Sequence, residues 1–339
     1  MDKKIWTYLL HLGDNMWEDP LSAPPRYPIE ASGGWPYSDT LRCDREVWRR
    51  VVDQLPSFGI NAVLIDIGDG LCYESHPELS VKGAWTREEL TEELAHMRSI
   101  GLEPLPKLNF SACHDGWLHD YAYMLSTQKY YEVARDLIRE VCEVFGNPRF
   151  FHLGMDEEDY PDHHVGMTSI RSDALWWHDL YFYFDEVERY GARPWIWSDY
   201  FWKHQADWQK KMPKDCVQSN WYYDPIQPKR ENGFYPQVPY QTYVEFSRMG
   251  YDQIPTASDW LYRQNMADTV WLCLEEGLCD EHMLGFMNAP WLPATDLNYY
   301  SLLNGAQRTK YARAMFEEYS EKTRAEMIDR MTPNIPFGF

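Results

Sequence analysis

The sequence predicts a (β/α)₈ barrel, in which eight parallel strands alternate with outer helices. Eight short apolar runs recur along the 339 residues, and segments with a helical period separate them. Alternation of strands and helices at this spacing predicts a parallel sheet, and eight repeats close such a sheet into a barrel. Barrels of this length routinely form one unit, so we expect a single domain over 1–339 with a C-terminal tail at about 326–339.

Each predicted strand is a mostly apolar run that ends at polar or turn-forming residues. The runs are Trp6–Leu12, Ala62–Ile67, Glu103–Leu108, Phe150–Leu153, Pro194–Trp197, Cys216–Asn220, Ile254–Ala257 and Leu284–Met287. Catalytic groups of a barrel lie at the carboxyl ends of its strands. The residues directly after each run are therefore the candidates for a site.

Segments with a helical period fill the spaces between these runs. The clearest are Thr86–Ile100, Thr127–Phe145, Ser172–Tyr190, Tyr240–Met249, Met266–Glu276 and Asn304–Glu321. The first begins with a capping box, in which Thr86 and Glu89 satisfy each other's backbone N–H groups. Gly59, Gly101 and Gly191 precede strands at positions typical of the left-handed residue that ends a helix.

Composition narrows the classes of partner. The 53 acidic and 32 basic side chains give a formal net charge of -21, which repels a nucleic-acid backbone and offers no basic surface for it. No apolar stretch approaches the roughly 20 residues needed to span a bilayer, so we expect neither nucleic acid nor a membrane as a partner. Aromatic residues make up 16% of the chain, and their flat faces suit stacking against the C–H faces of sugar rings.

The seven cysteines are scattered along the chain and form no CxxC pair. An odd, dispersed set argues against a disulfide framework and against a zinc ribbon. It favours a reducing compartment, so we expect a cytoplasmic protein.

The densest group of candidate catalytic residues directly follows the fourth predicted strand. It is His152-Leu153-Gly154-Met155-Asp156-Glu157-Glu158. Carboxylates crowded at a barrel mouth raise one another's pKa values, and a carboxylic acid kept protonated near neutral pH can protonate a glycosidic oxygen. The sequence therefore predicts a glycoside hydrolase with Glu157 as its catalytic acid, and a solvated acidic turn is the alternative.

A metal site is a further alternative for the same region. His163 and His164, with Asp156 and Glu158 nearby, are residue types that bind metals. Their spacing matches no metal-binding motif, so we expect neither a metal nor another cofactor.

The segment around Glu157 resembles the strand-four signature of the family 20 glycoside hydrolases, the exo-β-N-acetylhexosaminidases. That signature is His-x-Gly-(Gly/Ala)-Asp-Glu, and Met155 takes the place of the small residue here. The strand-two region is similar as well. Its segments Ser75-His76-Pro77-Glu78-Leu79 and Thr86-Arg87-Glu88-Glu89-Leu90 are similar to the family's Tyr-Pro-Glu-Leu and Thr-x-Glu-Glu-(Leu/Ile). The resemblance is strongest over residues 60 to 160.

The resemblance implies a carbohydrate substrate and a substrate-assisted, retaining mechanism. Glu157 would be the general acid/base, and Asp156 would hold the N–H of the substrate's 2-acetamido group, whose oxygen attacks the anomeric carbon. Tyr223 would hydrogen-bond the acetamide oxygen, with Asp224 close by. Further substrate-binding candidates, from the resemblance or from their position after a strand, are Trp197, Trp221, Trp291, His114, Asp69 and Asn15.

Two departures from the family keep alternatives open. The arginine that usually ends strand one is absent from Asp14-Asn15-Met16, and Pro106-Lys107-Leu108-Asn109 begins the segment that replaces Pro-Glu-x-Asp-x-Pro-Gly-His. One alternative is a two-carboxylate glycosidase with Asp199 or Asp259 as the second acid. The other is a carbohydrate-binding barrel without catalytic activity.

Overall fold

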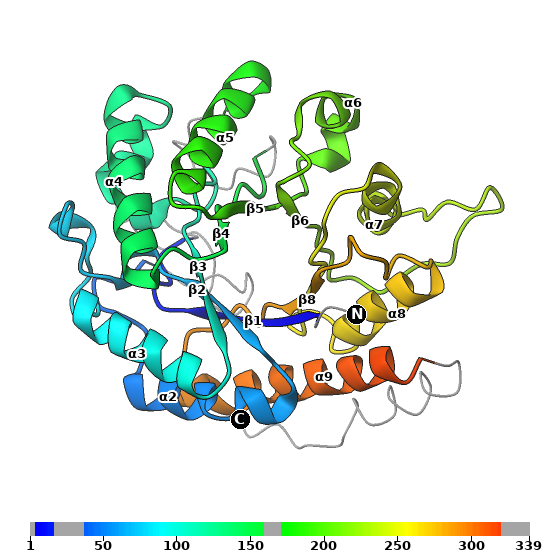
Figure 1. Cartoon of the computed structure of the whole chain (residues 1–339), viewed down its shortest axis with the longest axis horizontal. Coiled ribbons are helices and arrows are strands. Elements are labelled where there is room, and N and C mark those ends of the chain that lie inside the picture. Colours follow the sequence, from blue (N-terminus) through cyan, green and yellow to red (C-terminus); the bar gives the residue numbers. More distant parts are fainter. Residues whose placement is uncertain (1–3, 17–36, 159–170, 320–339) are drawn as a thin grey trace.

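The computed structural model describes residues 4–16, 37–158 and 171–319, and these residues form a barrel of parallel strands (Figure 1). The strand order is β6-β5-β4-β3-β2-β1-β8-β7. The bounds are β1 Ile5–His11, β2 Ala62–Asp66, β3 Glu103–Lys107, β4 Phe150–His152, β5 Arg193–Trp197, β6 Val217–Ser219, β7 Thr256–Ala257 and β8 Gly285–Asn288. Every predicted run overlaps one of these strands, so the predicted fold class is confirmed. The predicted tail at 326–339 and the pair His163 and His164 lie outside the described residues.

Backbone hydrogen bonds close the sheet between β6 and β7. The N–H of Gln218 donates to the carbonyl of Asp252, and the N–H of Thr256 donates to the carbonyl of Asn220, each at 2.9 Å. These bonds join the two outermost strands of the order, which is what closes a sheet into a barrel.

The strands are buried on both faces. Residues that point into the barrel form an inner core, which includes Leu9, Leu64, Leu105, Phe150, Trp195 and Met287. Their neighbours Leu10, Ile65 and Ile196 point outward and pack with residues of the helices. Burial on both faces explains why the strands are continuous apolar runs in the sequence and lack an alternating pattern.

Helices surround the barrel (Figure 1). Their bounds are α2 Arg45–Val52, α3 Arg87–Ser99, α4 Gln128–Phe145, α5 Asp173–Glu188, α6 Phe201–Lys211, α7 Val238–Met249, α8 Asn265–Glu275 and α9 Tyr299–Glu317. The sequence pattern does not predict α2 or α6, and α9 begins at Tyr299, five residues before the expected start. Short 3₁₀ helices also occur, among them Gly68–Gly70 after β2 and Gly116–Met124 before α4.

The helix ends follow the predicted signals. Glu89 N donates to Thr86 Oγ1 at 3.2 Å, and Thr86 N donates to Glu89 Oε2 at 2.7 Å, which confirms the capping box of α3. Gly59, Gly101 and Gly191 have φ angles of 79°, 86° and 74°. The predicted left-handed positions before the strands are therefore confirmed.

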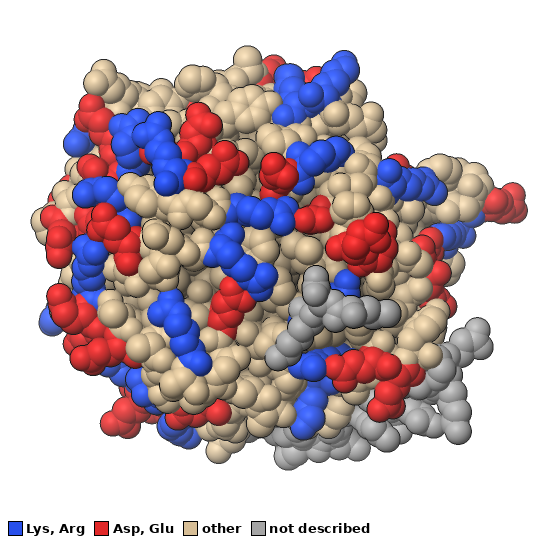
Figure 2. All heavy atoms as spheres, in the orientation of Figure 1, with Lys and Arg blue, Asp and Glu red and all other residues tan. Residues whose placement is uncertain are grey.

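Acidic and basic side chains are interspersed over the face of the molecule shown in Figure 2. All seven cysteines are free thiols. None of the described helices is both long enough and apolar enough to cross a membrane.

Candidate active site

The turn after β4 carries the two predicted catalytic acids. Gly154, Met155 and Glu157 have φ angles of 75°, 74° and 52°, a region that residues other than glycine rarely adopt. A Cβ atom on Gly154 would lie 1.9 Å from Asn109 Oδ1, so only glycine fits there. Strained backbone of this kind persists only where the surrounding structure holds it, and it is concentrated at functional sites.

His114, in the loop after β3, lies beside both acids. Its Nε2 atom is 3.0 Å from Glu157 Oε2 and 3.3 Å from Asp156 Oδ2. Burial lowers the pKa of His114, but the charges of Asp156 and Glu157 outweigh burial and raise the pKa to about 9. The imidazole is therefore protonated at neutral pH. The Asp156 side chain is 11% exposed and that of Glu157 is 31% exposed, so Glu157 is the more accessible acid.

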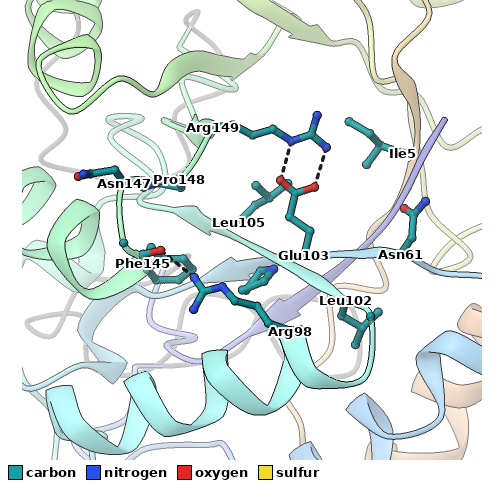
Figure 3. A pocket seen from close by; sticks show the side chains of 13 residues that line it. Ile5, Asn61, Arg98, Leu102, Glu103, Leu105, Phe145, Asn147, Pro148 and Arg149 are labelled. Carbon is teal, nitrogen blue, oxygen red and sulfur yellow. Dashed lines mark hydrogen bonds and ion pairs between the residues drawn. The ribbon is translucent and has the colours of Figure 1, made fainter. Parts of the chain in front are cut away.

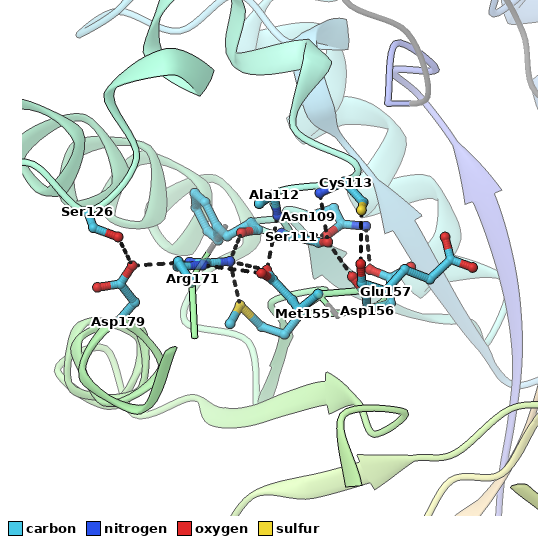
Figure 4. Close-up of polar contacts among 12 residues, drawn as sticks. Asn109, Ser111, Ala112, Cys113, Ser126, Met155, Asp156, Glu157, Arg171 and Asp179 are labelled. Carbon is cyan, nitrogen blue, oxygen red and sulfur yellow. Dashed lines mark hydrogen bonds and ion pairs between the residues drawn. The ribbon is translucent and has the colours of Figure 1, made fainter. Parts of the chain in front are cut away.

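Asn109 and Asp199 fix the two acids from either side of the pair. Asn109 Nδ2 donates to Asp156 Oδ1 at 3.0 Å (Figure 4). Asp199 Oδ2 accepts the backbone N–H of Glu157 at 2.7 Å, and its Oδ1 accepts from Trp221 Nε1 at 3.1 Å. Burial, and then the charge of Asp156, raise the pKa of Asp199 well above its usual range. Both oxygens of Asp199 are thus engaged in holding neighbouring groups.

A group of aromatic side chains lies next to Asp199, beginning with Trp221. The rings of Trp221 and Tyr223 stack with centroids 5.2 Å apart, and Trp291 Nε1 donates to the Tyr223 hydroxyl at 3.1 Å. The ring of Trp197 lies 5.9 Å from that of Trp291. Burial raises the pKa of Tyr223 well above its usual range, so its hydroxyl keeps a proton that it can donate. The structure therefore brings Trp197, Trp221, Tyr223 and Trp291 into one group with the acids.

A second polar group lies at the carboxyl ends of β1 and β2. Asn15 Nδ2 donates to Asp69 Oδ2 at 2.8 Å, as expected for two residues after neighbouring strands. Arg42 Nε donates to Asp14 Oδ2 at 3.1 Å, and its Nη2 donates to Asn15 Oδ1 at 3.3 Å. Arg42 is a candidate that sequence reasoning missed. It supplies a guanidinium at the end of strand one, where the sequence motif itself has no arginine.

Two of the candidate acids make their contacts elsewhere. Asp224 is exposed, and its carboxylate interacts with the hydroxyl of Tyr222. Asp259 forms an ion pair with Arg308 of α9. The contacts of both acids lie outside the group around Glu157, although both follow strands as the sequence predicts.

A separate pocket of about 600 Å³ lies at the amino-terminal end of the barrel (Figure 3). Its charged side chains are paired: Arg149 donates to both oxygens of Glu103 at 2.5 and 2.6 Å, and Arg98 donates to the Phe145 carbonyl at 2.7 Å. None of the predicted site residues lines this pocket. In the described part of the chain, His, Cys, Asp and Glu side chains form no group of three or more that could hold a metal ion.

The fold and these contacts define a barrel protein with acids, an imidazole and tryptophans gathered at the carboxyl ends of its strands. No protein-family model matches the sequence, and no curated protein sequence matches it. The structure, however, is similar to solved structures of family 20 glycoside hydrolases.

One is the chitobiase of Flavobacterium johnsoniae, with a TM-score of 0.62 and 15% identity over 85% of this chain and 49% of that chain. A second is the exo-β-N-acetylglucosaminidase of Vibrio harveyi, with a TM-score of 0.60 and 13% identity over 96% of this chain and 56% of that chain. A third is the β-N-acetylhexosaminidase of Bacteroides fragilis, with a TM-score of 0.58 and 12% identity over 97% of this chain and 71% of that chain. The chain spans about half the length of the first two. The resemblance to family 20 is confirmed at the level of the fold.

Proposed function

We propose that this chain is a glycoside hydrolase that removes terminal β-linked N-acetylhexosamine by substrate-assisted, retaining catalysis. The observation that carries the proposal is the adjacent pair Asp156 and Glu157, which a strained turn presents beside His114. The similarity of the barrel to a chitobiase and to an exo-β-N-acetylglucosaminidase supports it.

In the first step, the acetamide oxygen of the substrate attacks the anomeric carbon and the glycosidic bond breaks. Glu157, the more accessible of the two acids, takes a proton from the adjacent His114 imidazolium, 3.0 Å away, and gives it to the leaving oxygen. Asp156 accepts a hydrogen bond from the acetamide N–H and so orients the internal nucleophile. The product of this step is a cyclic oxazolinium, and the mechanism needs no enzyme nucleophile.

In the second step, the Glu157 carboxylate takes a proton from water as the water attacks the same carbon. The C–O bond to the acetamide oxygen breaks, which regenerates the acetamide and leaves the sugar with its original β configuration. The Tyr223 hydroxyl, protonated and turned toward Trp291, is the donor that stabilises the acetamide oxygen.

The remaining groups suit recognition of a sugar ring. Trp197, Trp221 and Trp291 offer aromatic faces for its C–H groups. Arg42 and Asp69 offer a donor and an acceptor for its hydroxyls at the ends of β1 and β2. A terminal sugar bound between these two groups is the substrate class that we propose.

The rival function is a glycosidase in which Asp199 is the nucleophile, because Asp199 also contacts Glu157. Its two oxygens already accept hydrogen bonds from the Glu157 backbone N–H and from Trp221 Nε1, so neither is free to attack a sugar, and burial raises its pKa well above the usual range. These observations favour the substrate-assisted mechanism.

Paired p-nitrophenyl β-glycosides, identical except for the 2-acetamido group, test the proposal. We expect hydrolysis of the β-N-acetylglucosaminide and a collapse of the rate on the β-glucoside, because the latter lacks the attacking oxygen. A thiazoline that mimics the oxazolinium should bind more tightly than the parent sugar, and Asp156→Asn should lower the rate. Equal hydrolysis of both glycosides, with no effect of the thiazoline, establishes the two-carboxylate rival. Sugar binding without hydrolysis of either establishes the non-catalytic barrel.

The proposed location is the cytoplasm. It is supported by the seven cysteines, all of which are free thiols, because thiols persist in reducing compartments.

A further inference from the structure

A buried ion pair lies directly behind the proposed catalytic acid. Glu158 follows Glu157 in the chain, and Arg171 precedes α5. Both side chains are 0% exposed, and their charged groups are in direct contact. A buried pair of this kind has to be completed by further hydrogen bonds, because each charge has lost its hydration.

Those further hydrogen bonds go to the loop after β3, which carries His114. Glu158 Oε1 accepts the backbone N–H of Ala112 at 3.0 Å. Arg171 Nη2 donates to the carbonyl of Phe110 at 2.7 Å. The ion pair therefore bridges the loop that bears Glu157 and the loop that bears His114 (Figure 4).

Arg171 is anchored on its other side by α5. Its Nη1 atom donates to the Tyr183 hydroxyl at 3.0 Å and lies 3.3 Å from Asp179 Oδ2. Asp179 in turn accepts a hydrogen bond from Ser126 at 2.6 Å. Figure 4 shows Arg171 between Asp179 and the turn that contains Met155. The guanidinium is thus fixed by packed elements on both sides.

The turn that the pair supports needs such support. Met155 and Glu157 adopt left-handed backbone conformations, which cost free energy and persist only when neighbouring contacts hold them. Arg171 Nη2 contacts Met155 Sδ at 3.7 Å, and Glu158 follows Glu157 directly. Arg171 therefore contacts one strained residue directly, and Glu158 anchors the chain immediately after the other.

We propose that Arg171 and Glu158 are positioning residues that hold Glu157 at its working distance from His114. The expected effect on the rate rests on the proposed function. The distance between Glu157 and His114 can be tested without a substrate. A displacement of about 1 Å in a catalytic group can lower a rate on the order of 10²-fold.

The ionisation of His114 reports this geometry. The charged groups that face His114 are Asp156 and Glu157 on the turn after β4, Lys107 at the end of β3, Asp66 at the end of β2 and Asp115 in its own loop. Asp156 and Glu157 raise the pKa of His114 to about 9, and Lys107 opposes them. Movement of the turn away from the β3 loop weakens the carboxylate effect, so the pKa falls toward 6.5.

The first variant is Arg171→Met, which removes the cation but keeps an apolar stem. We expect kcat to fall on the order of 10²-fold with little change in KM, because substrate contacts remain. We expect the pKa of His114, followed by NMR and assigned with His114→Asn, to fall below the wild-type value. Arg171→Lys retains the charge but not the fork of donors, so it should restore both readouts in part.

Glu158→Gln tests the other partner with a smaller perturbation. The carboxamide still accepts from Ala112, so the variant should fold, with a fall in kcat and in the pKa of His114 between those of wild type and Arg171→Met. The control is Arg135→Met, which removes a partner of Glu186 at 3.0 Å between α4 and α5. We expect this control to leave kcat and the titration of His114 unchanged.

The outcomes separate the two proposals. Folded Arg171→Met, or Glu158→Gln if the former does not fold, with the wild-type kcat and an unshifted His114 titration overturns the positioning role. A wild-type protein that hydrolyses no glycoside overturns the proposed function. In that case the His114 titration still decides whether the ion pair sets the distance between the two loops.

Discussion

At the scale of single residues, the proton on His114 links the site to stability. The folded pKa of about 9 lies above the usual value of 6.5, so the folded protein binds this proton more tightly than the unfolded chain does. The resulting stabilisation is fully present below pH 6.5 and is lost as the pH rises through 9.

The first prediction concerns how the stability that His114 provides changes with pH. Urea denaturation of wild type and His114→Asn should show a difference in the free energy of unfolding that shrinks between pH 6.5 and pH 9. The total change should be on the order of 3 kcal/mol. A difference that stays constant over this range means that the carboxylates do not hold the proton on His114.

Glu157 is the residue on which the proposed chemistry depends. Glu157→Gln keeps the shape of the side chain but cannot donate a proton to the leaving oxygen. We expect the rate on a substrate with a poor leaving group to fall by roughly 10²–10⁴, with the fold retained and stability lowered only by the part of the His114 interaction that Glu157 supplies. Near-normal turnover of that substrate by the variant removes Glu157 from the role of acid.

Local sequence could identify some site residues and not others. Asp156 and Glu157 stand in a motif that follows β4. Tyr223 lies two residues beyond Trp221, shortly after β6. Arg42 lies 27 residues beyond Asn15, and only the closed barrel places it at the end of strand one. Arg171 has no motif of its own, because its partners come from the loops after β3 and β4 and from α5.

At the scale of elements, the strands were predictable because continuous burial makes each one an apolar run. The helix α2 has only eight residues, which is too short for a clear period. The helix α6 contains a non-helical residue, His204, with φ of −120° and ψ of 35°, so its pattern is interrupted. Length and regularity therefore decided which helices the sequence could predict.

The turn after β4 gives the prediction at this scale. In Gly154→Ala the new Cβ would lie 1.9 Å from Asn109 Oδ1, and Asn109 holds Asp156. Gly101→Ala is the matched control, since its φ is also positive but its Cβ meets nothing within 4 Å. We expect the free energy of unfolding of the control to fall only by the cost of a left-handed alanine, about 1–2 kcal/mol, and its activity to stay normal. Gly154→Ala should lose more stability and most activity; equal effects in urea denaturation contradict the packing argument.

At the scale of the whole molecule, a row of polar residues crosses four strands inside the barrel. His11, Asp66, Lys107 and His152 are partners in register on β1, β2, β3 and β4. Lys107 and Asp66 are in direct contact, and their side chains are 0% and 2% exposed. Burial raises the pKa of Asp66, while the ammonium of Lys107 opposes that rise. The barrel therefore encloses a charge pair at the level where the strands end and the site begins.

The last prediction concerns the stability that Lys107 and Asp66 provide. It compares the loss of one charge, which leaves the other buried without a partner, with the loss of both charges. Lys107→Met leaves the Asp66 carboxylate buried without its cation and should lower the free energy of unfolding by about 3–5 kcal/mol at pH 7. Lys107→Met with Asp66→Leu removes both charges and should recover most of that loss, because well-packed apolar residues replace such pairs at little cost. Lys211→Met is the surface control: its pair with Asp207 is 2.9 Å long, with side chains 37% and 43% exposed, and it should cost less than about 1 kcal/mol. Urea denaturation of the four proteins measures these values. If Lys107→Met destabilises no more than Lys211→Met does, then Asp66 stays neutral in the barrel, and the row is held by hydrogen bonds without an ion pair.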